Sequence, residues 1–267
     1  MTTFSGKAAE FLALHVPGDP LLQPNAFDVG SAKILAALGF KAIATTSSGA
    51  AGTFGRLDGR MTRGEVLEHC TALSEAVAVP VAADYENGFA DEPMLVADSV
   101  ARAGATGLAG VSIEDWSGSA IYDRALAVER VRAAAEAAHA NNLVLTARAE
   151  NLIHGVDDLD DAIARAQAFG AAGADVIFVP GLRAIEQVRA VVSSVDAPVN
   201  VLVLQGCPAV GEVAAAGAAR ISVGGSLMYA AYAAVIAAAT ELKAAGTYGY
   251  WDAIAAARDT IRGAFGA

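Results

Sequence analysis

Short apolar runs alternate with amphipathic segments along almost the whole chain. Eight of the apolar runs are continuous rather than alternating, which is typical of strands buried on both faces. The predicted strands are Leu21–Ala26, Ala42–Thr46, Val81–Asp84, Gly110–Glu114, Leu143–Arg148, Val176–Val179, Val199–Val203 and Arg220–Val223. The predicted helices lie near residues 28–38, 62–77, 91–103, 125–140, 157–172, 183–194, 207–216 and 226–244.

Eight strand–helix units in 267 residues predict an α/β protein with a single (β/α)8 TIM-type barrel, a domain occupying residues 1–267. A doubly wound open sheet often has a Gly-x-Gly-x-x-Gly turn after its first strand, and none follows here. Residues 245–267 form a predicted C-terminal extension with one more helix over 251–265. An extra apolar helix needs a surface to pack on, so we expect a neighbouring subunit to supply it.

Composition narrows the possible partners. With 18 Lys+Arg against 29 Asp+Glu, the formal net charge is −11, which disfavours nucleic acid and anionic membranes. The most apolar stretch, near 230–239, is about half of the ~20 residues that a membrane span needs. Two cysteines make no disulfide framework, and we expect a soluble cytoplasmic protein. An anionic substrate must therefore be held by a local device, such as a metal ion or a few arginines.

Polar residues gather where the predicted strands end, which is where a barrel of this kind has its active site. Asp84 and Glu86 follow the third strand, Glu114 ends the fourth, and Arg148 ends the fifth. Converging carboxylates repel one another unless a divalent cation neutralises them. Oxygen ligands favour Mg²⁺, with Mn²⁺ as a substitute, over Zn²⁺. The predicted metal ligands are therefore Asp84, Glu86 and Glu114.

The remaining polar residues at this end suit a 2-oxo acid. Arg148 is able to hold a carboxylate in a bidentate fork. The expected turn Ser47-Ser48-Gly49 offers hydroxyl and backbone N–H donors to a second carboxylate or an oxyanion. A cation that chelates the carboxylate and keto oxygens would stabilise the enolate that forms when a bond at C3 breaks.

Each of these residues also has a purely structural interpretation. A carboxylate at the end of a strand often caps the following helix. Asp58 lies in a long loop after the second strand, where the residue pattern does not choose between a turn residue and a site residue. His69, His139 and His154 are expected to be solvated, and Cys207 to start a helix.

Five short motifs follow one another along the chain in a recognisable order. In chain order they are Asn25-Ala26-Phe27-Asp28, Thr46-Ser47-Ser48-Gly49, Asp84-Tyr85-Glu86-Asn87-Gly88-Phe89, Ser112-Ile113-Glu114-Asp115 and Thr146-Ala147-Arg148. They resemble the Asn-Ala-Trp-Asp, Thr-Ser-Gly, Asp-x-Asp-x-Gly-Tyr, Ile-Glu-Asp and Ala-Arg-Thr-Asp segments of the isocitrate lyase/phosphoenolpyruvate mutase superfamily. The resemblance runs from about Pro24 to Gly225, and its order and spacing make it specific.

The resemblance implies roles for the site residues. Asp84 would bind Mg²⁺ directly, and Glu86 and Glu114 would act through metal-bound waters. Ser47, Ser48 and Gly49 would hold the substrate carboxylate and enolate oxygen. Arg148 would contact the substrate, and Asp58 would lie near the reacting bond. The superfamily also implies a barrel whose eighth helix is exchanged between subunits, in a homo-oligomer that is a dimer or a tetramer.

Three departures from the superfamily pattern bear on the reaction. Isocitrate-type lyases carry a Lys-Lys-Cys-Gly-His segment whose cysteine is the general acid, whereas residues 116–123 here contain neither Cys nor His. The gating-loop Lys and Asn of the mutase and of phosphonopyruvate hydrolase are missing from the same stretch. The usual Pro-Glu after the sixth strand is Pro180-Gly181. The shorter loop is expected to leave the site open to water.

These departures disfavour cleavage of isocitrate by the usual route and weaken phosphorus–carbon chemistry. The favoured hypothesis is a Mg²⁺-dependent carbon–carbon lyase that cleaves or decarboxylates an oxaloacetate-like 2-oxo acid through a metal-stabilised enolate. Asp58, Arg148 and Ser47 are its candidate catalytic residues. One alternative is a phosphonate mutase or hydrolase, and another is a 2-oxo acid binding protein without turnover.

Overall fold

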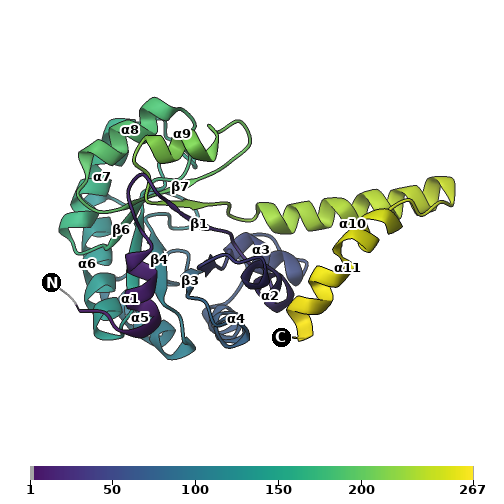
Figure 1. Ribbon diagram of the computed structural model, residues 1–267. Coiled ribbons are helices and arrows are strands. Elements are labelled where there is room, and N and C mark those ends of the chain that lie inside the picture. The colour runs from purple at the N-terminus through teal and green to yellow at the C-terminus, as the bar shows by residue number, and fades with distance from the viewer. Residues whose placement is uncertain (1–2, 267) are drawn as a thin grey trace.

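The computed structural model describes residues 3–266 and contains eight parallel strands. They are β1 (Leu21–Gln23), β2 (Ile43–Ala44), β3 (Val81–Asp84), β4 (Gly110–Glu114), β5 (Val144–Arg148), β6 (Val176–Phe178), β7 (Val199–Leu202) and β8 (Arg220–Ser222). The hydrogen-bonded order runs β1-β8-β7-β6-β5-β4-β3-β2, and a bridge between Asn25 and Ala44 joins the two ends. All eight predicted strands are therefore present, in a nearly closed barrel (Figure 1).

Helices alternate with the strands, which confirms the (β/α)8 prediction. The predicted ones are α2 (Val29–Ala37), α4 (Arg63–Ala76), α5 (Pro93–Ala103), α6 (Arg124–Ala140), α7 (Leu159–Ala171), α8 (Ile185–Ser194), α9 (Val210–Ala215), α10 (Ser226–Ala245) and α11 (Trp251–Gly266). Three elements were not predicted: α1 (Gly6–Ala13), α3 (Ser47–Thr53) and the 3₁₀ turn η1 (Gly104–Thr106).

Helix α1 covers the N-terminal end of the barrel. Its Ala8 and Phe11 are fully buried in a cluster with the first residues of several strands. Gly110 at the start of β4 makes room for Phe11, since a Cβ there would lie 3.0 Å from the Phe11 ring and 2.7 Å from the Val144 carbonyl oxygen. The opposite end of the barrel is left free for the site.

Residues 47–49 form the first turn of α3, which corrects the expectation of a turn at this position. The Thr46 side chain caps the helix by accepting a hydrogen bond from the Gly49 amide at 3.3 Å. A Cβ at position 49 would lie 2.4 Å from the Thr46 methyl group, so only glycine fits under the cap. Thr46 is thus the N-cap residue of α3, although the Ser-Ser-Gly that follows it is also typical of a turn.

Helix α10 projects away from the barrel, and α11 folds back toward α2 (Figure 1). The expected apolar run of about ten residues is part of a 20-residue helix, which is long and apolar enough to cross a membrane by length and composition. Only 6% of that helix window is buried in this chain. One such helix is weak evidence for a membrane span, and a cytoplasmic location stays a prediction.

The base of this arm contacts the barrel of its own chain. Met228 is buried beside Gly52 of α3, and the Tyr232 hydroxyl donates to the Gly52 carbonyl at 3.0 Å. Farther out, Ala264 of α11 is buried, and Phe265 lies 3.5 Å from the Cβ position of Gly30 in α2. Most of α10 has no cover, with Val235 and Ile236 about two-thirds exposed. Helix exchange and oligomerisation stay predictions.

His15 lies just after α1 and is buried beneath the barrel. Its Nδ1 is 2.8 Å from the Phe11 carbonyl oxygen, which accepts only, so Nδ1 carries the proton. Burial, with a smaller contribution from the Arg220 charge, lowers the pKa of His15 from 6.5 to about 3. The ring is therefore neutral in the folded protein throughout the physiological range.

A His15→Gln variant tests this burial. Between about pH 6.5 and pH 3 the unfolded chain binds a proton at His15 that the folded chain does not, so stability falls as the pH drops through that window. We expect the wild type to lose up to about 1.4 kcal/mol per pH unit more than His15→Gln. Denaturant unfolding at about pH 6.5 and pH 5 measures the difference. Parallel losses in the two proteins would contradict a buried neutral ring.

Candidate active site

Three charged side chains meet at the C-terminal ends of neighbouring strands. Asp84 ends β3, Glu114 ends β4 and Arg148 ends β5, and the strand register pairs Glu114 with Arg148. The Arg148 guanidinium donates to Asp84 Oδ1 at 2.6 Å, and its NH1 lies 3.3 Å from Glu114 Oε2. The sequence prediction that these three residues converge is therefore confirmed by their geometry.

Arg148 is a largely buried cation, with 15% of its side chain exposed, and it also donates from Nε to Glu150 Oε1 at 2.8 Å. Burial alone would lower the pKa of Arg148, but the charges of Glu150, Glu114 and Asp84 raise it well above its ordinary value. The guanidinium lies over the Phe178 ring, 5.2 Å from its centroid. Arg148 is thus permanently charged and fixed from several sides.

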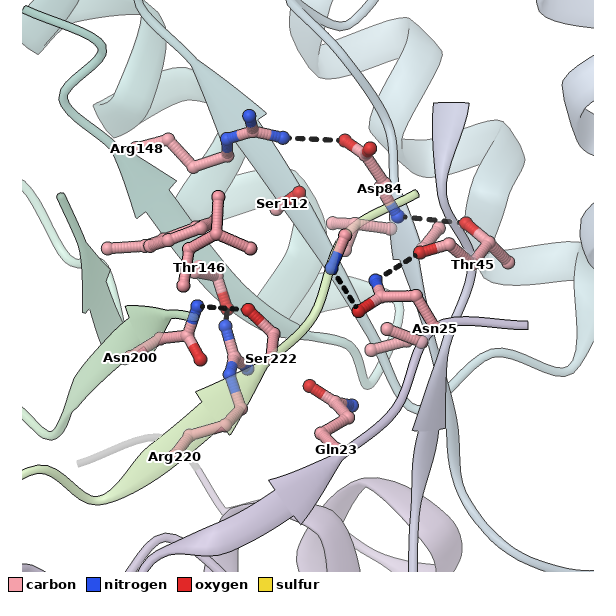
Figure 2. Close-up of a pocket in the computed structure, with 17 residues that line it drawn as sticks. Gln23, Asn25, Thr45, Asp84, Ser112, Thr146, Arg148, Asn200, Arg220 and Ser222 are labelled. Carbon is pink, nitrogen blue, oxygen red and sulfur yellow. Dashed lines mark hydrogen bonds and ion pairs between the residues drawn. The ribbon is translucent and has the colours of Figure 1, made fainter. Parts of the chain in front are cut away.

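Asp84 is oriented by the strand and helix beside it. Its amide donates to Thr45 Oγ1 at 3.0 Å, and its Oδ2 accepts from the Ser47 amide at 3.0 Å. Figure 2 shows Asp84 directed toward Arg148 at the upper end of the barrel interior. Both carboxylate oxygens of Asp84 thus face partners within the site.

Glu86 and Asp58 add two more carboxyl groups. Burial, then the charges of Asp84 and Asp58, raise the pKa of Glu86 to about 7. Asp58 lies on the open wall of the site, where partial desolvation and the Asp84 charge raise the pKa of its carboxyl, while a hydrogen bond with the Ser47 side chain opposes the rise. At Glu114 burial likewise raises the pKa well above its usual value, although Arg148 opposes it. The acidic groups outnumber the one arginine among them.

The loop that carries Glu86 has an unusual backbone. Glu86 and Phe89 have φ values of 50° and 59°, a region that costs non-glycine residues about 1 kcal/mol or more. The buried Arg130 holds this loop by donating to the carbonyls of Asn87 and Ala90, each at 2.6 Å. Arg130 was missed in the sequence because it occupies an ordinary position in an alanine-rich helix.

A cavity of about 880 Å³ opens over these groups. Its lining includes Ser47, Asp58, Glu86, Glu114 and Arg148. Ser48 and Gly49 do not line it: the Ser48 hydroxyl lies 3.1 Å from that of Thr46, and Gly49 is buried beneath its cap. Below the cavity, a smaller one of about 80 Å³ continues into the barrel past Asp84 (Figure 2).

The short loop after β4 folds into a tight turn. The Ser117 amide donates to the Ala120 carbonyl at 2.9 Å, and Trp116 forms an isolated antiparallel β-bridge with Ile121. The Trp116 ring stacks on His154 with centroids 3.7 Å apart and planes 9° apart. His154 Nε2 lies 3.4 Å from Glu150 Oε2, and both residues line the large cavity. His154, expected to be a solvated residue, is therefore a neighbour of the charged cluster.

Gly181 explains how the His154 loop reaches the cavity. Its φ is 98°, and a Cβ there would lie 2.7 Å from the Ile153 amide nitrogen. Glycine at this position, where the superfamily that the sequence resembles usually has Glu, thus allows the 151–155 loop to pack against the end of β6.

Several other polar candidates have structural roles. Asp115 is buried, accepts from the Glu150 amide at 2.8 Å and pairs with Arg165 at 3.1 Å. Burial raises the pKa of the Cys70 thiol to about 12, and Cys207 Sγ accepts from the Leu204 amide. Neither cysteine lines the cavity around Arg148. Within residues 3–266, no three His, Cys, Asp or Glu side chains are already grouped to hold a metal ion.

Comparison with protein families matches residues 11–243 to the phosphoenolpyruvate phosphomutase family. A crystal structure of a lyase/mutase candidate from Burkholderia cenocepacia J2315 superposes with a TM-score of 0.91 at 43% identity, and covers 96% of this chain and 94% of that one.

Three relatives match this chain over smaller shares of its length. The uncharacterised protein Rv1998c of Mycobacterium tuberculosis H37Rv is 36% identical over 85% of this chain and 87% of its own. The 2-methylisocitrate lyase of Escherichia coli K12 is 30% identical over 70% of each chain. An oxaloacetate decarboxylase of Bradyrhizobium sp. BTAi1 is also 30% identical, over 74% of this chain and 71% of its own.

Proposed function

Because the chain belongs to the phosphoenolpyruvate mutase/isocitrate lyase superfamily, we propose that it is a Mg²⁺-dependent carbon–carbon lyase that decarboxylates an oxaloacetate-like 2-oxo acid. The observation that carries the proposal is the set of carboxyl groups around Arg148 at the floor of an open cavity without a cysteine. Relatives named as lyases and as an oxaloacetate decarboxylase support carbon–carbon chemistry on this scaffold.

The donor set fits a hard divalent cation. Asp58, Asp84, Glu86 and Glu114 supply only oxygen, and their mutual repulsion contributes to the raised pKa values of Glu86 and Glu114. Because the side chains do not already form a closed cage, the cation would keep several waters, as Mg²⁺ prefers. We assign Asp84 as the direct ligand, with Glu86 and Glu114 acting through those waters; Mn²⁺ is expected to substitute. When bound, such an ion would offset the negative charge of the enolate.

The residues of this chain would position the acid. Arg148 presents a fixed guanidinium at the cavity floor, suited to an anionic substrate. The Ser47 side chain and Asp58 lie next to Asp84, which supports a role for Asp58 near the reacting bond. We also propose that Ser48 and Gly49 support the substrate-binding end of α3, although neither lines the cavity.

Decarboxylation requires that one carbon–carbon bond breaks and that one proton is added. The C3–C4 bond of the acid breaks, CO₂ leaves, and the electron pair stays on C3 as the enolate of the shortened acid. A proton must then be added at C3. Isocitrate-type cleavage needs a cysteine acid at the loop after β4, and no residue of the 116–121 turn can replace it. The open cavity admits water, which suits a reaction whose last step is protonation.

His154 is our candidate for the proton donor. The Trp116 stack fixes its ring plane, and Glu150 lies at ion-pair distance when the ring is protonated. Glu150 in turn bonds to Arg148, so one carboxylate connects the substrate-binding cation to the imidazole. A positioned histidine is the commonest general acid in enzymes.

The activity itself is tested with oxaloacetate and Mg²⁺, scored as pyruvate release above the rate with Mg²⁺ alone. We expect turnover by the wild type and a loss of about 10²-fold or more in Asp84→Asn, because the direct ligand is neutralised. Asp196→Asn, at an exposed position, is the matched control and should retain full activity. Phosphate or phosphoenolpyruvate released from phosphonopyruvate would favour the mutase alternative. Stabilisation by 2-oxo acids without any product would favour a binding protein.

The proton donor is tested with His154→Gln. We expect kcat to fall about 10²-fold with little change in KM, since the substrate still binds before protonation fails. His139→Gln is the matched control: the ring, expected to be solvated, pairs with Asp175 at 3.0 Å and does not line the cavity. An unchanged kcat in His154→Gln would show that solvent protonates the enolate without help.

A further inference from the structure

Arg220 is a buried cation that no carboxylate of residues 3–266 neutralises. It lies on β8 with a relative exposure of 4%. Its two amino groups contact His15 Nε2 and Thr146 Oγ1, each at 3.2 Å, and neither partner is an anion. Among residues 3–266 its Nε has no hydrogen-bond partner. Buried charges in proteins are ordinarily paired, because an unpaired one costs several kcal/mol of desolvation.

The neighbours of Arg220 leave its charge in place. His15 keeps its proton on Nδ1, so its Nε2 accepts from Arg220 and the ring contributes no charge. Burial, and then the charge of Arg148, lower the pKa of Arg220 to about 9, which still leaves the guanidinium protonated at neutral pH. Arg148 is matched by three carboxylates of its own. Within residues 3–266, Arg220 therefore has no carboxylate partner of its own.

The 80 Å³ cavity lies beside this charge (Figure 2). Asn200, which is 1% exposed, donates from Nδ2 to Ser222 Oγ at 3.0 Å, and its own Oδ1 has no partner among the described residues. Ser222 and Thr146 each accept one hydrogen bond here, which leaves their hydroxyl protons for another acceptor. The cavity thus offers an N–H donor and two O–H donors around an uncompensated charge. A single water occupies about 30 Å³ in the liquid, so there is space for a small ion and a water.

We propose that this interior cavity is a binding site for one small monovalent inorganic anion of the halide class, held by Arg220, Ser222 and Thr146. One negative charge matches the one unmatched guanidinium, whereas a dianion would leave a buried excess. A water beside the ion satisfies Asn200 Oδ1, which an anion cannot. The anion would lie on the Arg220 side of this cavity, whose other end is lined by Asp84 and Arg148 of the site proposed above.

Bromide is the probe, because its anomalous scattering identifies it in crystals. Crystals grown in sodium bromide are expected to show an anomalous peak in contact with the Arg220 guanidinium. In solution, replacing sodium gluconate by sodium bromide at constant ionic strength should raise Tm along a saturating curve, since bromide binds only the folded state. Gluconate is too large for the cavity and keeps screening constant.

Variants connect the two measurements to the site. Arg220→Met should abolish both the peak and the bromide-dependent Tm shift. Ser222→Ala keeps the Arg220 cation and removes one hydrogen bond to the anion, so it should weaken bromide binding about fivefold. This variant still tests the proposal if Arg220→Met does not fold. Arg132→Met, at an exposed site on α6, should behave as the wild type. A cavity that holds only water would overturn the proposal. So would a peak without a saturable Tm shift, which marks an adventitious ion only.

Discussion

The charge of Arg148 is the interaction on which the rest of the site depends. Three carboxylates point at one guanidinium at the end of β5, within 2.6–3.3 Å. Without that cation, the burial of Glu114 and Glu150 would leave two acids in a medium that strongly disfavours their charge. Arg148 therefore permits an acidic cavity floor in the folded protein, and the acids that it does not fully neutralise are available to a metal ion.

The barrel makes this arrangement possible through strand register. Because β3, β4 and β5 are parallel neighbours, their last residues lie side by side at one end of the sheet. The opposite end is closed by Phe11, so the polar interior opens in one direction only. Arg130 and Gly181 then shape the two loops that form the cavity wall. Part of the negative net charge of the chain is thus concentrated in the carboxyl groups that surround Arg148.

Much of this was predictable from the sequence. All eight strands and the polar residues at their ends follow from continuous apolar runs that stop at charged residues. Helix α1 was missed because it has only eight residues, and α3 because Ser-Ser-Gly is typical of a turn rather than a helix start. The contacts of His154, Arg130 and Arg220 join residues far apart in the chain, so no local pattern encodes them. Arg220 in particular is part of a short strand whose sequence gives no sign that its charge is unpaired.

The central claim is that the carboxyl groups around Arg148 form a cation site for an enolate. Oxalate has the planar, doubly charged shape of the pyruvate enolate, so its affinity reports on that site directly. Calorimetric titration of oxalate should give binding that is about 10²-fold tighter with millimolar Mg²⁺ than after chelation. Equal oxalate affinity in the two conditions, or no Mg²⁺ binding at millimolar concentration, would contradict the account.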